Sequence, residues 1–95
     1  MKIDFNKCND VLTVSLDGRL DTITAPEFES FLNENFDETA SLIIDCKKLV
    51  YVSSAGLRVL LTTKKKVKTM KLIDVCELVM EVLEMTGFAD ILEIE

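Results

Sequence analysis

Two short apolar runs separated by a helix-like segment constrain the fold of this chain more than any other feature. The runs "SLIIDC" (41–46) and "MKLIDV" (70–75) have the length and composition of strands. Between them, from Ala55, apolar side chains recur at helical spacing, which predicts a helix that ends near Lys68. Because a right-handed crossover joins such strands, we expect parallel neighbours in an α/β fold. The run 41–46 predicts a central strand that is buried on both faces.

The first twenty residues show the alternation of a β-hairpin. Ile3 and Phe5 lie on one side of "KIDFNK", and every second residue of "VLTVSLDG" is apolar. Asn9 and Asp10 between the two runs predict the turn. Gly18 either ends the second strand or forms a bulge in it.

The tetrapeptide "TAPE" at 24–27 predicts the start of the first helix. Thr24 is expected to cap it, Glu27 completes a capping box, and Pro26 suits the first turn. The helix is expected to end near Phe36 or Asp37. Its apolar stripe consists of Phe28, Phe31, Leu32 and Phe36.

A third helix and a last short strand complete the pattern. Leu78, Val79, Val82 and Leu83 follow the helical period, and Gly87 is expected to cap the helix end. The residues 91–94 are compatible with a final strand, which gives the order β-β-α-β-α-β-α(-β). We therefore expect one small α/β domain over residues 1–95, with a mixed sheet of four to five strands covered by three helices. The core is expected to contain Ile43, Ile44, Phe28, Phe31, Leu57, Leu60, Leu61, Val79 and Leu83.

Composition excludes several classes of function. A net charge of −6 disfavours direct binding to nucleic acid. The start "MKIDFNKCND" lacks the apolar region of a signal peptide, and no run is long enough to span a membrane, so we expect a cytoplasmic protein. With no histidine and with widely spaced cysteines, neither a metal site, a disulfide framework nor a cofactor is expected. Cys8, Cys46 and Cys76 are interpreted as buried or half-buried free thiols.

A cluster of five lysines, Lys64, Lys65, Lys66, Lys68 and Lys71, stands out in this acidic chain. Cations at the end of a helix complement its dipole, so a solvated helix terminus is the favoured interpretation.

The stretch "YVSSAGLRVLL" (51–61) places two hydroxyls where a strand turns into a helix. Either Ser53 or Ser54 can cap the free amides of the first turn. The same position suits a phosphate, because the positive end of the helix dipole favours an anion. Gly56 is expected to leave the backbone open to close approach by another molecule. An enzyme is not expected, because the G-x-S-x-G pattern, a general-base histidine and a phosphate-binding loop are all missing.

Taken together, "GRLDTITAPEFE", "LIIDCKKLVYVSSAGLRVLL" and "VMEVLEMTGFADIL" resemble the STAS family, and within it the bacterial anti-sigma-factor antagonists. The resemblance implies a binding module without enzymatic activity that captures an anti-sigma factor with serine-kinase activity and so releases a sigma factor. It implies that the kinase phosphorylates Ser54, that binding is then lost, and that a phosphatase resets the switch. The partner surface implied in this way comprises Asp21, Thr22, Ser53, Ser54, Gly56, Leu57 and Arg58.

Two departures from the family pattern bear on this site. Many members have an aspartate where this chain has Ser53, so either serine is a candidate for modification. The segment "KKKVKTMKLI" lacks the usual Gly-Gly loop after the second helix. The alternative function is an accessory STAS subunit of a membrane transport complex without a phosphoswitch. In it Ser54 is only a cap, and the lysines contact an acidic partner or lipid headgroups.

Overall fold

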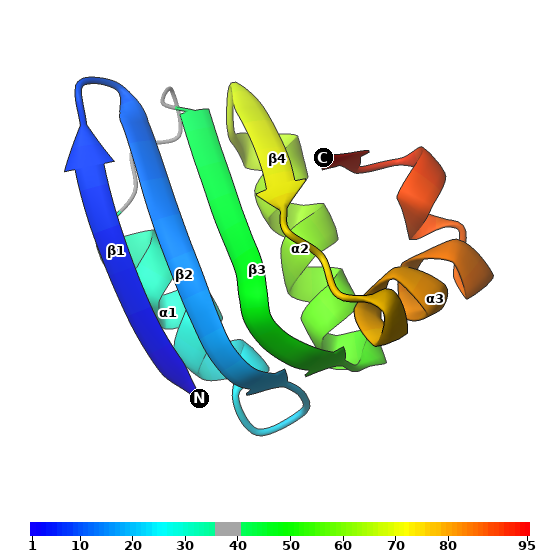
Figure 1. The fold of residues 1–95 in the computed structure, drawn as a ribbon. Helices are drawn as coiled ribbons and strands as arrows, with labels where there is room; N and C mark the ends of the chain where they lie inside the picture. Colours follow the sequence, from blue (N-terminus) through cyan, green and yellow to red (C-terminus); the bar gives the residue numbers. More distant parts are fainter. Residues whose placement is uncertain (36–40) are drawn as a thin grey trace.

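The computed structural model describes residues 1–35 and 41–95, which form one mixed sheet with helices packed against it (Figure 1). The strands lie in the order β1-β2-β3-β4-β5, and only β1 runs antiparallel to its neighbour. The strands are β1 (Lys2–Cys8), β2 (Val11–Leu20), β3 (Ser41–Val52), β4 (Thr69–Ile73) and β5 (Glu93–Ile94). The helices are α1 (Ala25–Asn35), α2 (Ser54–Lys66), α3 (Glu77–Met85) and the single-turn η1 (Phe88–Asp90). The predicted α/β class and order of elements are confirmed, including the last strand.

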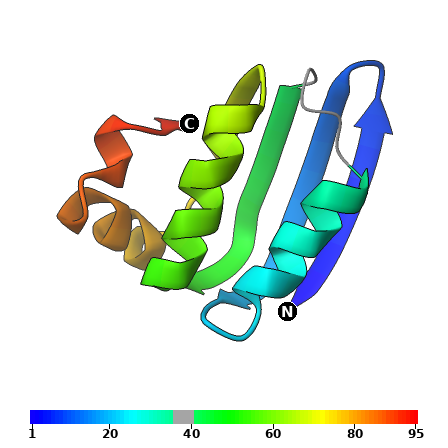
Figure 2. The same ribbon diagram turned by 180° about the vertical axis from the view of Figure 1, so that it is seen from behind.

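The helices α1 and α2 lie side by side on one face of the sheet (Figure 2). The helix α3 lies beyond β4, at the opposite side of the sheet from β1 (Figure 1). The expectation that β3 is buried on both faces is wrong. Leu42, Ile44 and Cys46 are buried, but Ile43 and Asp45 between them are only half-buried, because α1 and α2 cover one face alone.

The β1–β2 hairpin forms as predicted. Asn9 in the turn has a left-handed backbone with φ 56°, and Cys8 pairs with Val11. Gly18 does not end the second strand. It has φ 117°, and the pairing of β2 with β3 shifts register on both sides of it, so the bulge is the correct alternative. The strand continues to Leu20, and this extension carries it to the start of α2.

The predicted core is largely confirmed. Phe28, Leu57, Leu60, Val79 and Leu83 are buried, whereas Phe31 and Leu61 are half-buried. The predicted stripe residue Phe36 and the predicted end of the first helix at Phe36 or Asp37 lie outside the described residues. Gly87 follows α3 with φ 81° and donates its amide to the carbonyl of Glu84, which confirms the predicted cap.

The three cysteines are free thiols in different environments. Cys46 is fully buried, and burial raises the pKa of its thiol to about 12. Cys76 is half-buried and its sulfur lies 3.4 Å from the carbonyl oxygen of Leu49. Cys8 is exposed, so the prediction for it is wrong. Cys8 lies at the end of the edge strand β1, three residues after Phe5. Its side chain is therefore on the opposite face of the strand from Phe5, whose ring packs against Phe31 of α1.

The connection after α2 is short, as the missing Gly-Gly loop suggested, but it lies earlier in the chain than predicted. The helix ends at Lys66, two residues before the predicted end, and only Val67 and Lys68 precede β4. The amide of Val67 donates to the carbonyl of Thr63 at 3.2 Å, which closes the last turn without a glycine loop. Lys71 lies on β4 and pairs with Glu95 at 2.8 Å, so the lysine cluster is divided among α2, the connection and β4. Within the described part of the chain, no helix is both long and apolar enough to cross a bilayer.

Replacing Leu60 by Ala should reduce the free energy of unfolding by about 2–5 kcal/mol, because Leu60 is 2% exposed and its deletion leaves a cavity. The matched variant Leu61→Ala removes the same atoms from a half-buried position and should cost clearly less. Chemical denaturation measures both. A loss well under 1 kcal/mol for Leu60→Ala, or equal losses for the two variants, would contradict the orientation of α2.

Candidate functional site

The end of β2 leads into a tight turn, Asp21–Thr24, that is held by one carboxylate. The Oδ1 atom of Asp21 accepts hydrogen bonds from the amides of Ile23 at 3.0 Å and Thr24 at 3.1 Å. Arg19 adds a longer ion pair, with 3.8 Å between its Nε and Oδ2 of Asp21. The bond from the Thr24 amide, more than any other contact, lowers the pKa of Asp21 below its ordinary value. The turn is therefore built around a charged Asp21.

Thr24 closes this turn instead of capping α1 in the predicted way. Its hydroxyl donates to the carbonyl of Arg19 at 2.7 Å and accepts from the amide of Asp21 at 2.9 Å. These bonds direct the side chain back toward β2 and away from Glu27. The sequence identified the residue correctly as a local hydrogen-bonding group, but the capping box expected with Glu27 is wrong.

The start of α2 assigns different roles to the two serines. Ser53 is the N-cap: its hydroxyl oxygen accepts from the amide of Gly56 at 3.4 Å, and its carbonyl accepts from Leu57 at 2.9 Å. Ser54 is the first residue of the helix and is exposed. Its hydroxyl has no hydrogen-bond partner within residues 1–35 and 41–95, whereas that of Ser53 is committed to the cap. Of the two capping alternatives, the structure supports Ser53.

The turn and the start of α2 are joined directly. The amide of Ser53 donates to the carbonyl of Leu20 at 2.9 Å. Asp21 is the residue after the acceptor and Ser54 the residue after the donor, so this bond brings the two predicted site residues near each other. A methyl group placed on Gly56 would come within 2.8 Å of the Leu20 carbonyl oxygen and 2.9 Å of a Val52 methyl. Gly56 thus permits close packing of α2 on its own chain. The expectation that it leaves backbone open to another molecule is wrong, because Leu20 and Val52 occupy that space.

The side chains that surround this junction differ in accessibility. Thr22, Ile23, Ser54 and Arg58 are exposed, and Asp21 and Ser53 are half-buried. Leu57 is only 4% exposed and Gly56 is buried, so these two predicted partner residues support the surface from beneath.

Ile23 was missed by the sequence reasoning. It is 85% exposed at the tip of the turn, which is unusual for so large an apolar side chain. The signal in the sequence was its position between Thr22 and Thr24, outside both the strand and the helix periodicity. An apolar residue that matches neither period has no place in the core.

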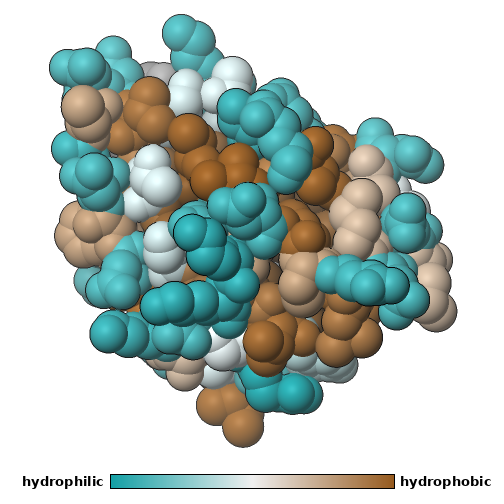
Figure 3. All heavy atoms as spheres, viewed as in Figure 1, coloured by the Kyte–Doolittle hydropathy of each residue, from teal (hydrophilic) through white to brown (hydrophobic). Residues whose placement is uncertain are grey.

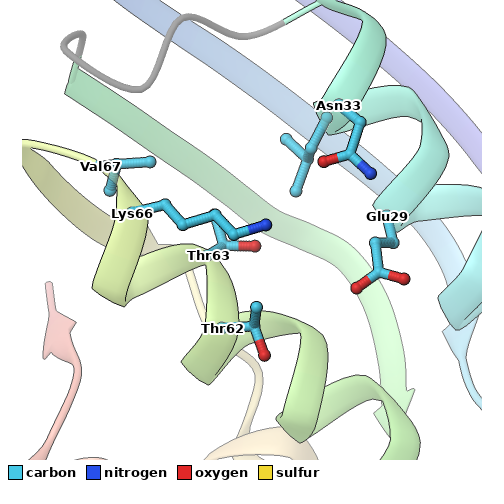
Figure 4. A pocket seen from close by; sticks show the side chains of 7 residues that line it. Glu29, Asn33, Thr62, Thr63, Lys66 and Val67 are labelled. Carbon is cyan, nitrogen blue, oxygen red and sulfur yellow. The ribbon is translucent and has the colours of Figure 1, made fainter.

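A groove runs between α1 and α2 from this junction toward the other end of the helices. Next to Ser54 it widens to a hollow of about 210 Å³, lined by residues that include Thr22, Pro26, Ala55 and Arg58. Farther along, Glu29 and Asn33 of α1 lie opposite Thr62, Thr63 and Lys66 of α2 (Figure 4). That second hollow measures only about 70 Å³, well below the volume of usual cofactor pockets. The groove suits the side chains of a protein partner better than a cofactor.

Replacing Gly56 by Ala should destabilise the protein by about 1–3 kcal/mol, because the new methyl group collides with the backbone of Leu20. The expected sign is opposite to the usual gain of about 0.5–1 kcal/mol for this change within a helix. Urea denaturation measures it. A more stable variant would show that α2 and the turn are not packed as closely as described.

Replacing Asp21 by Ala should loosen the turn and destabilise the protein, because the amides of Ile23 and Thr24 lose their acceptor. Asp21→Asn retains the acceptor oxygen and should cost less. Because the folded state lowers the pKa of Asp21, its charge stabilises the fold above the ordinary pKa of 3.8. That contribution is lost as the pH falls through the lowered value. Denaturation at pH 7 and at pH 2.5 should therefore show a smaller difference between Asp21→Asn and the unaltered protein at the lower pH; an equal difference would contradict it.

Comparisons with known proteins place the chain in a family. The family model of the STAS domain matches residues 2–95. A protein of Bordetella bronchiseptica, named as the anti-sigma factor antagonist BtrV, is 33% identical over 96 residues, which cover 96% of this chain and 83% of that protein. The anti-sigma-B factor antagonist of Bacillus subtilis is 29% identical, covering 99% and 90% of the two chains. The crystal structure of an anti-sigma factor antagonist from Mycobacterium paratuberculosis superimposes with a TM-score of 0.86 at 21% identity, covering 98% and 83%. The chain belongs to the STAS domain family.

Proposed function

We propose that this STAS domain is an anti-sigma-factor antagonist whose binding is switched by phosphorylation of Ser54. In the unphosphorylated form it captures an anti-sigma factor with serine-kinase activity, and the sigma factor is released. The names of the two relatives support the general role. The observation that carries the switch is the exposed hydroxyl of Ser54 at the start of α2, beside a neighbouring serine that already serves as the cap.

The accessible side chains around Ser54 support a role in protein binding. Ile23 offers an apolar anchor and Arg58 a planar cation, and Thr22 and Arg58 both line the hollow between α1 and α2. Buried apolar and arginine side chains are typical anchors at the centre of protein interfaces. We therefore assign the partner contacts to Asp21, Thr22, Ile23, Ser54 and Arg58, with Gly56 and Leu57 as internal supports.

For the modification itself, this domain needs to supply only an accessible hydroxyl. The Ser54 oxygen attacks the γ-phosphorus of ATP held by the partner kinase, the bond to ADP breaks, and the hydroxyl proton leaves. A separate phosphatase hydrolyses the new ester and restores the hydroxyl. The protein itself contributes the position of Ser54 and supplies no catalytic group.

The phosphate should leave the fold intact and weaken the binding of the partner. It adds about −1.5 to −2 charges at neutral pH. At the start of α2 this charge meets the positive end of the helix dipole. Arg58 follows four residues later, on the same side of the helix, and can pair with it. Outside the domain, the charge and bulk next to Asp21 oppose any acidic or closely packed partner surface.

Replacing Ser54 by Asp should weaken binding to the cognate anti-sigma factor at least tenfold, which corresponds to about 1.4 kcal/mol. The thermal stability should change by less than about 1 kcal/mol, because Ser54 is exposed. Ser54→Ala should bind as the unmodified protein does and resist phosphorylation. A matched control is Ser30→Asp, which adds the same charge at an exposed serine of α1. Titration beside a thermal melt measures all three variants.

The site of phosphorylation is tested with the partner kinase and ATP, followed by mapping of the labelled residue. Labelling of Ser54 in both the unaltered protein and Ser53→Ala is the expected result. Labelling that disappears in Ser53→Ala but persists in Ser54→Ala would move the switch by one residue. Tight binding by Ser54→Asp would contradict the switch altogether and favour the accessory-subunit alternative.

A further inference from the structure

The charge of this protein is divided sharply along the chain. All 11 basic residues precede Leu72, whereas seven of the 17 acidic residues follow it. The first 71 residues are therefore close to neutral, and the last 24 account for the net charge of −6. This acidic segment forms α3, η1 and β5, which lie together at one side of the sheet (Figure 1).

The same segment exposes large apolar side chains. Leu78 is 54% exposed, Met85 is 87% exposed and Ile91 is 46% exposed. In α3, Leu78, Val82 and Met85 follow one another at spacings of four and three residues, so they form one stripe. The neighbouring face packs on the core through the buried Val79 and Leu83, and the half-buried Val82 in the middle of the stripe also packs against the core. Leu78 and Met85, at the two ends of the stripe, are therefore not needed to hold α3 on the domain.

Acidic side chains line this stripe. Glu77, Glu81 and Glu84 are all exposed and occupy the next sector of α3, and Asp90 lies in the adjoining η1. In Figure 3, brown and tan side chains over α3 are interspersed with teal ones. We call Leu78, Val82, Met85 and Ile91, with the acidic residues Glu77, Glu81, Glu84 and Asp90, the α3 face.

We propose that the α3 face is a second docking surface, beyond the one around Ser54, and that it binds a basic amphipathic helix of a partner protein. Leucine-type side chains of such a helix would cover Leu78 and Met85, and its flanking lysines or arginines would pair with the glutamates. The charge argues for this occupant. An anionic membrane surface is repelled by the acidic rim, and two α3 faces of a symmetric dimer would bring like charges together.

The test uses a synthetic 18-residue peptide of leucine and lysine arranged as an amphipathic helix, titrated against the full chain. We expect saturable binding that weakens with added salt and that Met85→Lys reduces at least tenfold. The matched control is Ser30→Lys, which introduces the same charge at an exposed residue of α1, outside both proposed docking surfaces. It should retain at least half of the affinity. A thermal melt of each variant verifies the fold.

Three results would overturn the proposal: equal binding by Met85→Lys, an equal loss in Ser30→Lys, or equal binding of a peptide in which glutamate replaces every lysine. Ultracentrifugation of the protein alone gives a further outcome. If the protein self-associates in a way that Met85→Lys abolishes, the occupant of the α3 face is a second copy that pairs its lysines with this face. This result would also contradict the proposal. None of these outcomes depends on phosphorylation of Ser54, so the two proposals can fail separately.

Discussion

The hydrogen bond from the amide of Ser53 to the carbonyl of Leu20 is the contact on which the site depends. It joins the end of β2 to the start of α2, two points that are more than thirty residues apart in the sequence. Gly56 makes this approach possible, since any side chain there would collide with Leu20. The bulge at Gly18 also contributes, because the register of β2 against β3 shifts just before this junction. The turn and the helix start therefore form one unit.

In that unit, the residues that hold the fold together differ from the residues that are accessible to a partner. Ser53 satisfies the first turn of α2 and Leu57 enters the core, so Ser54 and Arg58 are left on the surface. Asp21 fixes the turn through its carboxylate, which leaves Ile23 exposed at the tip. A phosphate at Ser54 would thus alter the surface without removing any of the contacts that hold the junction. The α3 face shows a similar division, because Leu78 and Met85 are exposed whereas Val79 and Leu83 hold the helix on the core.

The order of elements could be predicted because strand and helix periods are local properties of the sequence. The burial of Leu57 and Leu60, and the caps at Ser53 and Gly87, follow from the same local rules. The errors concern tertiary relations. Periodicity could not show that one face of β3 lacks a covering helix, nor that Leu20 fills the space beside Gly56. Ile23 was missed for the opposite reason, since a search for periodic apolar residues discards one that fits no period.

The most direct test of this account is amide hydrogen exchange at Ser53, followed by NMR in the unmodified and the Ser54-phosphorylated protein. If the junction is a rigid unit, the Ser53 amide should be protected like the core strands in both forms. Shifts caused by the phosphate should then be confined to the turn and the first turns of α2. Exchange at the rate of an unstructured chain in either form would contradict the account, because the Leu20–Ser53 bond would not hold the site together.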